Sequence, residues 1–523
     1  MMRLLTTLKR QPADNSVILT YNADLPFFEY MVFEPLYAAG CRNTLVVCDP
    51  MQYELALDDA PLLRYAGQRY LLMPARTSLK GAFHPKLILL TSADSGRVFL
   101  ASSNLTKAGY GRNWEVVTLF EYNSKKPDPT AWIACRWAFD TLWRIADASD
   151  TSGLALQRLD QLLGTTAWLR QESPLLSSSK VWLLHNLDAP LLGQVLAHYR
   201  RDDGSPVTEA LIVSPFFDAS AVAVSELLTE CQPKRLCLYT QEDTHSLNPQ
   251  ALASVLGRHD LEFQPYQLEL EGRLLHAKAL LLRTGRGTWL VTGSANFSRP
   301  AWLHPAAIGN TEIVVLRFES DPTYYDAWLD KLIASAHPLE LDWEAESSAG
   351  EPPPAVPESQ LTLLSATLDR RRLVLRLVEH LPTDATLTLH LTGEESQAIV
   401  YEQWEQRTDH RLILRLIPEL LPQFDSPALV TLVSSSPSGE LQSNPILLHN
   451  LGMLRRFSRP IKRRERPRVP EGMVPESYEH CAQLLDMLQD LLATNVEQLH
   501  RHRGRIAALK KRDQQEQQMA VEE

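Results

Sequence analysis

The sequence has few of the residues that build disulfide frameworks or metal clusters. It holds six cysteines among 523 residues, and none of them forms a Cys-x-x-Cys pair or a Cys/His group with zinc spacing. They are Cys41, Cys48, Cys135, Cys231, Cys237 and Cys481. We therefore expect reduced, structural thiols, with neither a bound metal nor another cofactor.

Long apolar runs and a strong positive charge are also missing. No apolar run is long enough to cross a bilayer, and the first residues, MMRLLTTLKRQPADNS, lack the long apolar region of a signal peptide. The sequence thus predicts a cytoplasmic protein without stable membrane association. Because the formal net charge is -11, any contact with nucleic acid must come from a local basic patch.

Two stretches of the chain follow the same pattern. Residues 16–50 predict a strand, a helix ending near Gly40, and a second strand, and residues 209–240 predict the same order. Each stretch is followed further along by a His-x-Lys sequence on an apolar run. Strands that alternate with helices favour α/β layers, so we expect two fused copies of one α/β domain.

The composition of the remaining chain changes several times. A segment rich in Pro, Ser and Glu is typical of a linker, short apolar runs between turn residues are typical of a β-sandwich, and leucines at helical spacing follow a basic stretch. We predict a first repeat over 1–165, a second repeat over 166–343, a linker over 344–359, a β-sandwich-like accessory domain over 360–452, a basic linker over 453–474 and a C-terminal helix over 475–523.

The residues that point to chemistry occur in both repeats. Each repeat has His-x-Lys in an apolar strand, a turn, a second apolar strand, a Ser-x-Asn or Ser-Ser-Asn segment, and then a Glu. These residues are His84, Lys86, Asn104 and Glu115 in the first repeat, and His276, Lys278, Asn296 and Glu312 in the second. The spacing from His to Asn is equal, from 84 to 104 and from 276 to 296. A single His-x-Lys carries little information, whereas a doubled motif in matching frames predicts one shared site.

This residue set suits a phosphodiester. Side chains two apart on a strand share a face, so His and Lys are expected to project together, and a hairpin returns the Asn beside them. Two lysines and two amides match the charge that develops on phosphoryl oxygens. One imidazole can attack phosphorus while the other protonates the leaving oxygen and then activates water, without a metal.

The paired segments resemble the two HKD motifs of the phospholipase D superfamily, over roughly residues 10–340. HAK…GSANFS matches closely and HPK…ASSNLT more loosely. The Asp that the family usually has five residues after the Lys is replaced by Thr91 and Arg283. The tyrosyl-DNA phosphodiesterase branch also lacks this Asp and has Asn with a downstream Gln or Glu. Asn104 with Glu115 and Asn296 with Glu312 are similar to that pattern.

The resemblance implies a fold and a division of roles. It implies two phospholipase D-like α/β repeats that form a pseudo-dimer, and a metal-independent reaction through a phosphohistidine. It assigns attack to His84 and protonation of the leaving group to His276, and it has Glu115 and Glu312 orient the histidine of the other repeat. The missing Asp places the catalytic rate in question and leaves the fold unaffected.

Several other residues have alternative interpretations. Ser294 either bonds to phosphate or caps the following turn, and Arg299 and His304 are interpreted as ordinary surface residues. The basic stretch either binds a nucleic-acid backbone, docks an acidic partner or is a solvated linker. Its candidate nucleic-acid-binding residues are Arg455, Arg456, Arg459, Lys462, Arg463 and Arg464.

We predict from the sequence a nuclease that cleaves DNA through a phosphohistidine, a function that fits bacterial anti-phage defence by analogy alone. One alternative is a phospholipid phosphodiesterase or phosphatidyltransferase, for which the loop RPAWLHPAAIG is the nearest membrane-binding candidate. Another is a non-catalytic subunit that binds nucleic acid or a protein. Nucleic acid is the expected partner, and a homodimer or a translocase or helicase partner is also compatible with the sequence.

Overall fold

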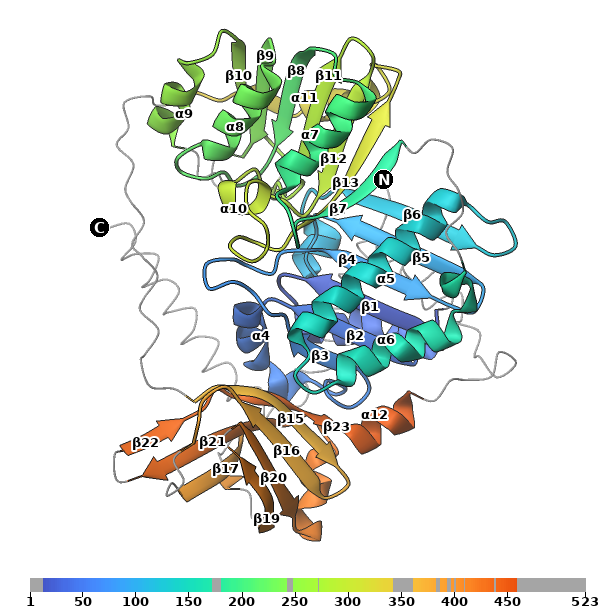
Figure 1. The fold of residues 1–523 in the computed structure, drawn as a ribbon, viewed down its shortest axis with the longest axis vertical. Coiled ribbons are helices and arrows are strands. Elements are labelled where there is room, and N and C mark those ends of the chain that lie inside the picture. Colours follow the sequence, from blue (N-terminus) through green and yellow to red (C-terminus); the bar gives the residue numbers. More distant parts are fainter. Residues whose placement is uncertain are drawn as a thin grey trace. The chain divides into compact units, whose positions relative to one another are not determined.

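The structure is a computed structural model that describes residues 13–171, 180–241, 248–270, 272–341, 361–381, 386–392, 397–398, 401–408, 410–436 and 439–458. The predicted linker, the C-terminal helix and most of the basic linker lie outside these residues. The described chain folds into mixed α/β layers and several sheets, so the predicted α/β class is confirmed (Figure 1). None of the described helices combines the length and the apolar character needed to cross a membrane.

The first sheet belongs to residues 13–171, which we call the first half. Its strands are β1 (Asn15–Thr20), β2 (Asn43–Cys48), β3 (Leu71–Pro74), β4 (Leu87–Thr91), β5 (Ser95–Ala101) and β6 (Val117–Asn123). They lie in the order β3-β2-β1-β4-β5-β6. The strands β1, β2 and β3 are parallel, and β4, β5 and β6 form an antiparallel meander beside β1.

The second sheet belongs to residues 180–341, the second half. Its strands are β7 (Val181–His185), β8 (Val207–Val213), β9 (Arg235–Thr240), β10 (Glu262–Leu268), β11 (Ala279–Thr284), β12 (Thr288–Gly293), β13 (Ile313–Glu319) and β14 (Ala336–Pro338). Six of them, in the order β10-β9-β8-β11-β12-β13, repeat the order and directions of the first sheet, while β14 and β7 extend the two edges. The chain therefore contains the same six-strand topology twice.

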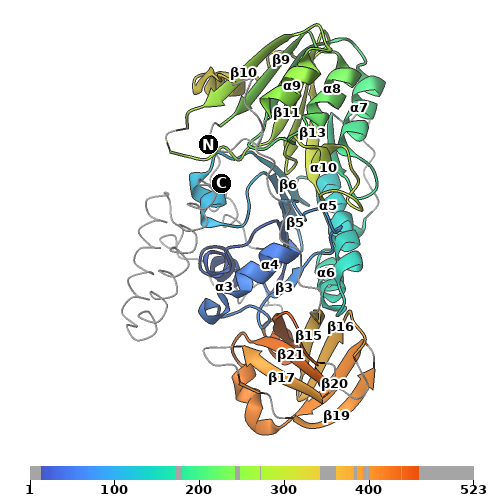
Figure 2. The ribbon, with the colours of Figure 1, turned by 90° about the vertical axis from the view of Figure 1, so that its left-hand side faces the viewer.

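Helices cover these sheets because the strands are buried on both faces. In the first half they are α2 (Leu25–Phe27), η1 (Phe28–Phe33), α3 (Glu34–Ala38), α4 (Pro50–Leu57), η2 (Ala60–Leu62), η3 (Ala108–Arg112), α5 (Pro129–Ser149), α6 (Leu154–Thr165) and η4 (Ala167–Arg170). Figure 2 shows α3 and α4 on one side of the first sheet and α5 and α6 on the other. The side chain of Asp49 caps α4, and Pro50 follows at its first position.

The helices of the second half are α7 (Leu191–Asp202), α8 (Val222–Cys231), α9 (Pro249–Leu256), α10 (Arg299–Trp302) and α11 (Asp326–Ile333). Asn248 caps α9 ahead of Pro249, which repeats the start of α4. Two cores cross the boundary between the halves. Ile313 and Val315 of β13 join the core of the first half, and Trp114 and Val116 pack against a core of the second half. The segments that follow the two motif asparagines thus pack against the other half.

The chain after residue 360 forms a separate sheet. Its strands are β15 (Leu363–Asp369), β16 (Arg372–Leu377), β17 (Thr386–Thr392), β18 (Gln397–Ala398), β19 (Tyr401–Thr408), β20 (Arg411–Leu416), β21 (Leu429–Ser436), β22 (Gly439–Gln442) and β23 (Ile446–Asn450), with η5 (Pro418–Phe424) and α12 (Leu451–Phe457). Gly67 of the first half accepts a 2.9 Å hydrogen bond from the backbone of Asn450. A side chain at Gly67, whose φ is +73°, would meet the carbonyl oxygen of Leu448 at 2.3 Å, so this contact requires glycine.

Candidate active site

Both His-x-Lys sequences lie directly before a strand rather than inside one. His84 and Lys86 occupy the extended segment that leads into β4, and His276 and Lys278 lead into β11. The prediction that they lie within strands was therefore wrong. The physical reason is that their backbones bond to the other half: the amide of His84 donates to Thr311 at 3.0 Å, and the amide of His276 donates to Trp114 at 3.0 Å.

Two isolated β-bridges fix which side chains meet. Phe83 pairs with Thr311 in parallel, and Trp114 pairs with Leu275 in parallel. In a parallel pair, the residues that follow two bridged positions point to the same side. Each histidine follows one bridged residue and each glutamate follows its partner. The backbone register thus pairs the histidine of one half with the glutamate of the other.

The two imidazole–carboxylate contacts are almost identical. His84 Nδ1 lies 3.0 Å from Glu312 Oε1 and 3.1 Å from Oε2. His276 Nδ1 lies 2.9 Å from Glu115 Oε1 and 3.0 Å from Oε2. When Nδ1–H donates to a carboxylate, the lone pair of Nε2 is left for chemistry. Both imidazoles are therefore oriented as nucleophiles or bases through Nε2.

A serine holds each carboxylate. Ser102 donates its hydroxyl to Glu115, and Ser294 donates its hydroxyl to Glu312. Neither a phosphate contact nor a turn cap, the two interpretations made for Ser294 from the sequence, describes this bond. Sequence reasoning missed Ser102, although the alignment of ASSN with GSAN places the two serines in the same frame.

An asparagine provides a second anchor for each carboxylate. Asn113 Nδ2 lies 3.3 Å from Glu115 Oε1, and Asn310 Nδ2 lies 3.3 Å from Glu312 Oε1. These two residues were also missed in the sequence. Their signal is an Asn-x-Glu sequence that occurs in both halves, N-W-E and N-T-E. The imidazoles, carboxylates, hydroxyls and amides thus form two matched networks.

The two lysines are buried beside the networks. Lys86 is 3% exposed and Lys278 is 1% exposed, and each ammonium donates to the carbonyl of the histidine two residues earlier, at 2.7 and 2.6 Å. Burial lowers the pKa of Lys86 well below its usual range and lowers the pKa of Lys278 to about 8. The charges of Glu115 and Glu312 act in the opposite direction and raise the pKa of both lysines. The groups of the two halves therefore share one electrostatic environment.

The same burial sets the charge of the other groups. It lowers the pKa of His84 and of His276 to about 4, so both imidazoles are neutral at pH 7 in the free protein. Burial alone would raise the pKa of Glu115 and of Glu312, but the neighbouring histidine and lysines outweigh it and hold both pKa values below their usual range. At neutral pH the cluster thus holds two carboxylate anions and the Lys278 ammonium around two neutral rings.

The two motif asparagines each have an unpaired atom. The side-chain oxygens of Asn104 and Asn296 are buried, and within the described part of the chain neither has a hydrogen-bond partner. An amide can be turned by 180°, so the unpaired end of each side chain can either accept or donate a hydrogen bond. Buried polar groups normally have partners, and here the same amide is unpaired in both halves.

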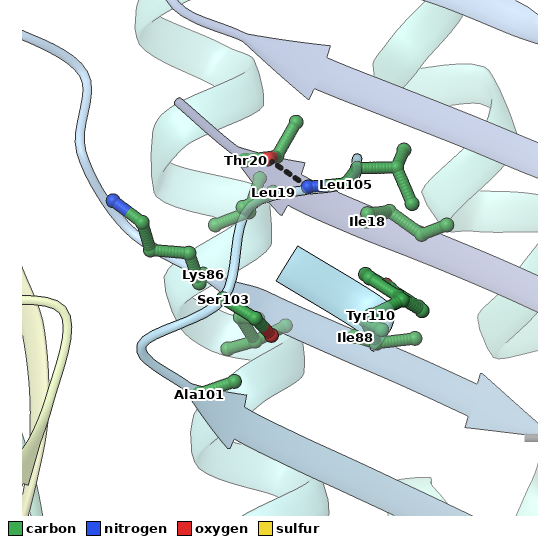
Figure 3. A pocket seen from close by; sticks show the side chains of 10 residues that line it. Ile18, Leu19, Thr20, Lys86, Ile88, Ala101, Ser103, Leu105 and Tyr110 are labelled. Carbon is green, nitrogen blue, oxygen red and sulfur yellow. Dashed lines mark hydrogen bonds between the residues drawn. The ribbon is translucent and has the colours of Figure 1, made fainter. Parts of the chain in front are cut away.

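Each lysine stem lines a small cavity. The cavity beside Lys86 is bounded mainly by apolar side chains of β1 and β4, among them Leu19 and Ile88. Its counterpart lies beside Lys278 between Val213 and Phe297. In Figure 3 the nitrogen of Lys86 points away from Ile88 and Tyr110. The apolar lining therefore packs the aliphatic stem, and the ammonium is left toward the histidine.

The positions five residues after Lys86 and Lys278 leave no gap in this cluster. Thr91 ends β4 and takes a 3.0 Å hydrogen bond from Asn15 and a 3.2 Å one with Thr166. Arg283 pairs with Glu209 at 3.0 Å and Asp326 at 2.7 Å. Both positions serve structural networks of their own half. Thr91 and Arg283 thus take no part in the imidazole–carboxylate pairs.

The basic residues proposed from the sequence lie elsewhere or outside the described chain. Arg455 of α12 pairs with Asp369 at 3.0 Å, and the guanidinium of Arg456 lies 5.6 Å from the ring centre of Phe457. Arg459, Lys462, Arg463 and Arg464 fall outside the described residues. In the described ranges, no group of three or more His, Cys, Asp or Glu side chains is placed to hold a metal ion.

Comparisons with known proteins give only remote similarity. No protein-family model matches the chain, and no curated protein matches it. Among solved structures, a polyphosphate kinase from Porphyromonas gingivalis is similar over 64% of this chain, with 13% identity and a TM-score of 0.32, and the match spans 47% of the kinase. NucT from Helicobacter pylori is similar over 31% of this chain and 99% of its own, with 14% identity and a TM-score of 0.22.

Proposed function

We propose that this chain is a phosphodiesterase that works without a metal, and that its two halves are phospholipase D-like repeats arranged as a pseudo-dimer around one site. The proposal rests on the crossed pairs His84–Glu312 and His276–Glu115, each held by a serine and an asparagine and flanked by a buried lysine. A structural role for either histidine alone is common. Two matched networks that exchange partners between the halves are explained best by chemistry on one substrate.

The lysines and asparagines account for binding of a phosphodiester. A buried ammonium is costly without an anionic partner. Lys86 and Lys278 are both buried in the same cluster, and their two amino groups can bind the nonbridging oxygens of the phosphate. The unpaired amide ends of Asn104 and Asn296 supply two more polar contacts. These groups hold charge that grows on the phosphoryl oxygens during the reaction.

The first chemical step is attack on phosphorus. Neutral His84 uses the lone pair of Nε2 to form a P–N bond, and the bond from phosphorus to the leaving oxygen breaks. Glu312 accepts a hydrogen bond from Nδ1–H of His84 and stabilises the positive charge that this imidazole acquires. His276 donates a proton from Nε2 to the leaving oxygen, so the first product departs as an alcohol.

The second step restores the protein. A water molecule attacks phosphorus, and its proton passes to the neutral Nε2 of His276. The P–N bond breaks and returns its electron pair to His84, which leaves a phosphomonoester as the second product. His276 has a pKa of about 4 in the free protein, and the negative charge of a bound diester raises the pKa of an imidazole beside it. Bound substrate therefore favours the protonated acid.

We infer that the substrate is nucleic acid and that the protein is a nuclease. The support is the same cluster, whose buried lysines and unpaired amide ends suit a diester anion. The test is hydrolysis of bis(p-nitrophenyl) phosphate and of labelled DNA in excess EDTA. We expect turnover that EDTA does not abolish and that His84→Ala and His276→Ala each reduce by roughly 10³-fold or more.

A matched control separates lost chemistry from lost folding. His337→Ala alters an exposed histidine that pairs with Glu269, and it should retain full activity. The circular dichroism spectrum and melting temperature of each variant should match the wild type. A strict requirement for a divalent metal, or near-normal turnover by either active-site variant, would contradict the proposal.

A further inference from the structure

Four chain segments surround the two imidazole–carboxylate pairs, namely residues 75–83, 104–114, 272–275 and 296–311. Together they contain no aspartate and no glutamate. They carry six cations: Arg76, Lys80, Lys107, Arg112, Arg273 and Arg299. The whole chain, in contrast, has a formal net charge of -11. These segments, which we call the basic rim, thus have a charge opposite to that of the molecule.

On one side the rim lies against the His276–Glu115 pair. Arg273 precedes His276 by three residues, and its Nε donates to the carbonyl of Arg112 at 3.0 Å. Its Nη2 donates to the carbonyl of Asn113, also at 3.0 Å. Since Asn113 itself contacts Glu115, these bonds place the cationic segments beside that carboxylate.

On the other side the rim lies against the His84–Glu312 pair. Ser78 donates to the carbonyl of Gly309 at 3.2 Å, and the amide of Ala82 donates to Asn310 at 3.0 Å. The Nε of Arg299 lies 3.3 Å from Nε2 of His304 on the same segment. The 75–83 and 296–311 segments are therefore joined next to Glu312.

Lys107 and Arg299 occupy equivalent positions in the two halves. Each lies three residues after the motif asparagine. In both halves the backbone makes the same tight turn between the motif asparagine and the cation. The amide of Thr106 donates to the carbonyl of Asn104 at 2.8 Å, and the amide of Ser298 donates to the carbonyl of Asn296 at 2.8 Å. Arg299 is exposed and Lys107 is half-buried. The duplication thus puts one cation on each side of the site.

We propose that Lys107 and Arg299 bind the phosphates that flank the scissile phosphate of a polynucleotide strand, and that Arg112 and Arg273 extend this contact. The inference rests on the proposed phosphodiesterase function. A phospholipid with a simple head group has one phosphodiester and offers no second phosphate on either side. A polynucleotide has phosphates on both sides, which matches cations at both ends of the site.

The alternative that the same segments offer is a membrane surface. Leu79, Leu274 and Ile308 are exposed on the rim, and apolar side chains among cations also suit an anionic bilayer. The experiment therefore compares three substrates: a labelled single-stranded oligonucleotide, bis(p-nitrophenyl) phosphate, and vesicles of phosphatidylglycerol. The variants are Lys107→Ala, Arg299→Ala and the double variant. Lys234→Ala and Arg258→Ala, at exposed cations outside the rim, serve as matched controls.

We expect the rim variants to change specificity. Each should raise the oligonucleotide KM by about two- to fivefold, and more strongly than the KM of the small diester, because the small diester has no flanking phosphates. The dependence of log kcat/KM on log salt for the oligonucleotide should become shallower by about 0.7 for each lost contact. Lys234→Ala and Arg258→Ala should leave both quantities unchanged.

Three outcomes would overturn the inference. The first is an oligonucleotide KM and salt dependence in the double variant equal to those of Lys234→Ala. The second is an equal loss on the oligonucleotide and on the small diester, which means that the cations support the site itself. The third is cleavage of phosphatidylglycerol without cleavage of the oligonucleotide. Failure of the wild type to hydrolyse the small diester would instead reject the phosphodiesterase function, and fluorescence anisotropy with the oligonucleotide would still test the two cations.

Discussion

The two halves have the same six-strand topology and the same reactive residues, yet their surroundings differ. Thr20 and Ser214 are equivalent hydroxyls at the ends of β1 and β8, and each accepts a 3.0 Å hydrogen bond from the residue after the motif Asn. The next residue is Tyr21 in the first half and Pro215 in the second. The ring of Tyr21 lies 5.3 Å from that of His84, whereas proline offers His276 no aromatic neighbour at this position.

A second difference concerns the residue that supports each His-x-Lys segment. Asp49 accepts a 2.8 Å hydrogen bond from the amide of Phe83, and Gln241 accepts a 2.8 Å bond from the amide of Leu275. The geometry is the same, but only the first half uses a carboxylate, and its charge acts on Lys86. The duplicated frame is therefore maintained by groups of unequal charge.

The two imidazoles also differ in exposure. The side chain of His84 is 10% exposed and that of His276 is 18% exposed. In the proposed second step a water molecule must reach His276, the general base. The greater exposure of His276 suits this role, and the smaller exposure of His84 suits a nucleophile from which water is excluded. The comparison teaches that a symmetrical set of side chains can have unequal neighbours, and these neighbours favour the proposed roles of His84 as the nucleophile and His276 as the acid and base.

The largest expected effect comes from removing one histidine at a time and following the first turnover. p-Nitrophenolate needs no proton to leave, so His276→Ala should release about one nitrophenolate per site and then stall with phosphorylated His84. His84→Ala should give no burst. Steady-state kcat should fall by roughly 10³-fold or more in both. Stopped-flow absorbance measures the burst, and mass spectrometry locates the phosphoryl group.

Two results of this experiment would contradict the proposed roles of His84 and His276. A burst from His84→Ala together with none from His276→Ala would exchange the two roles. Bursts of equal size from both variants would show that either imidazole can attack and that the unequal neighbours have no effect on the order.

The next largest effect tests the crossed pairing. Glu312→Gln and Glu115→Gln should each lower kcat/KM by about 10²-fold, because the uncharged amide no longer stabilises a cationic ring. Glu312→Gln should change the ring nitrogen resonances of His84 in ¹⁵N NMR spectra, and Glu115→Gln those of His276. Glu340→Gln, at an exposed glutamate, is the control. Larger changes at the histidine of the same half would contradict the crossed arrangement.

The third effect is on the pH profile of kcat/KM for an oligonucleotide, whose alkoxide leaving group needs a proton, and this profile reports the free protein. The pKa of His276 is about 4, so its acid form is lost as pH rises above that value and kcat/KM should decline by about tenfold per pH unit. The pKa of Lys278 is about 8, so its cation is lost above pH 8 and the decline should become steeper there. Lys278→Arg keeps the charge and should remove only this second change.

Two forms of the pH profile would contradict the assignments to His276 and Lys278. A flat profile between pH 5 and pH 8 would show that His276 does not act as the acid in the free protein. A steeper decline above pH 8 that persists in Lys278→Arg would assign that decline to another group. Circular dichroism at each pH serves as the control, because a loss of folded protein would lower the rate without any change in the protonation of the site.

The smallest effect concerns Tyr21. Loss of an aromatic contact to an imidazole changes a free energy by about 0.5–1.5 kcal/mol, so Tyr21→Ala should lower kcat/KM by about two- to tenfold. Tyr21→Phe keeps the ring and should stay close to the wild type, and Pro215→Ala is the matched change in the second half. Equal losses in Tyr21→Phe and Tyr21→Ala would assign the effect to the phenol hydroxyl instead of the ring.

The sequence alone determined the α/β class and the candidate residues. Strands and helices alternate because local hydrophobic periodicity reports which residues will be buried, and the second copy of each pattern shows the duplication. The equal His-to-Asn spacing selected His84, Lys86 and Asn104 together with their counterparts, since chance seldom repeats a polar motif in one frame. The serines and asparagines that support the carboxylates also repeat, as Ser102 with Ser294 and Asn113 with Asn310, but only an alignment of the two copies reveals them.

The tertiary structure decided which groups meet. The bridges Phe83–Thr311 and Trp114–Leu275 join residues far apart in the chain, and no local pattern encodes their register. They place each histidine before a strand and against the glutamate of the other half. Burial then sets the charge of the lysines and imidazoles, because desolvation depends on packing from both halves. The sequence thus supplied the chemical groups, and long-range packing supplied their partners and their protonation states.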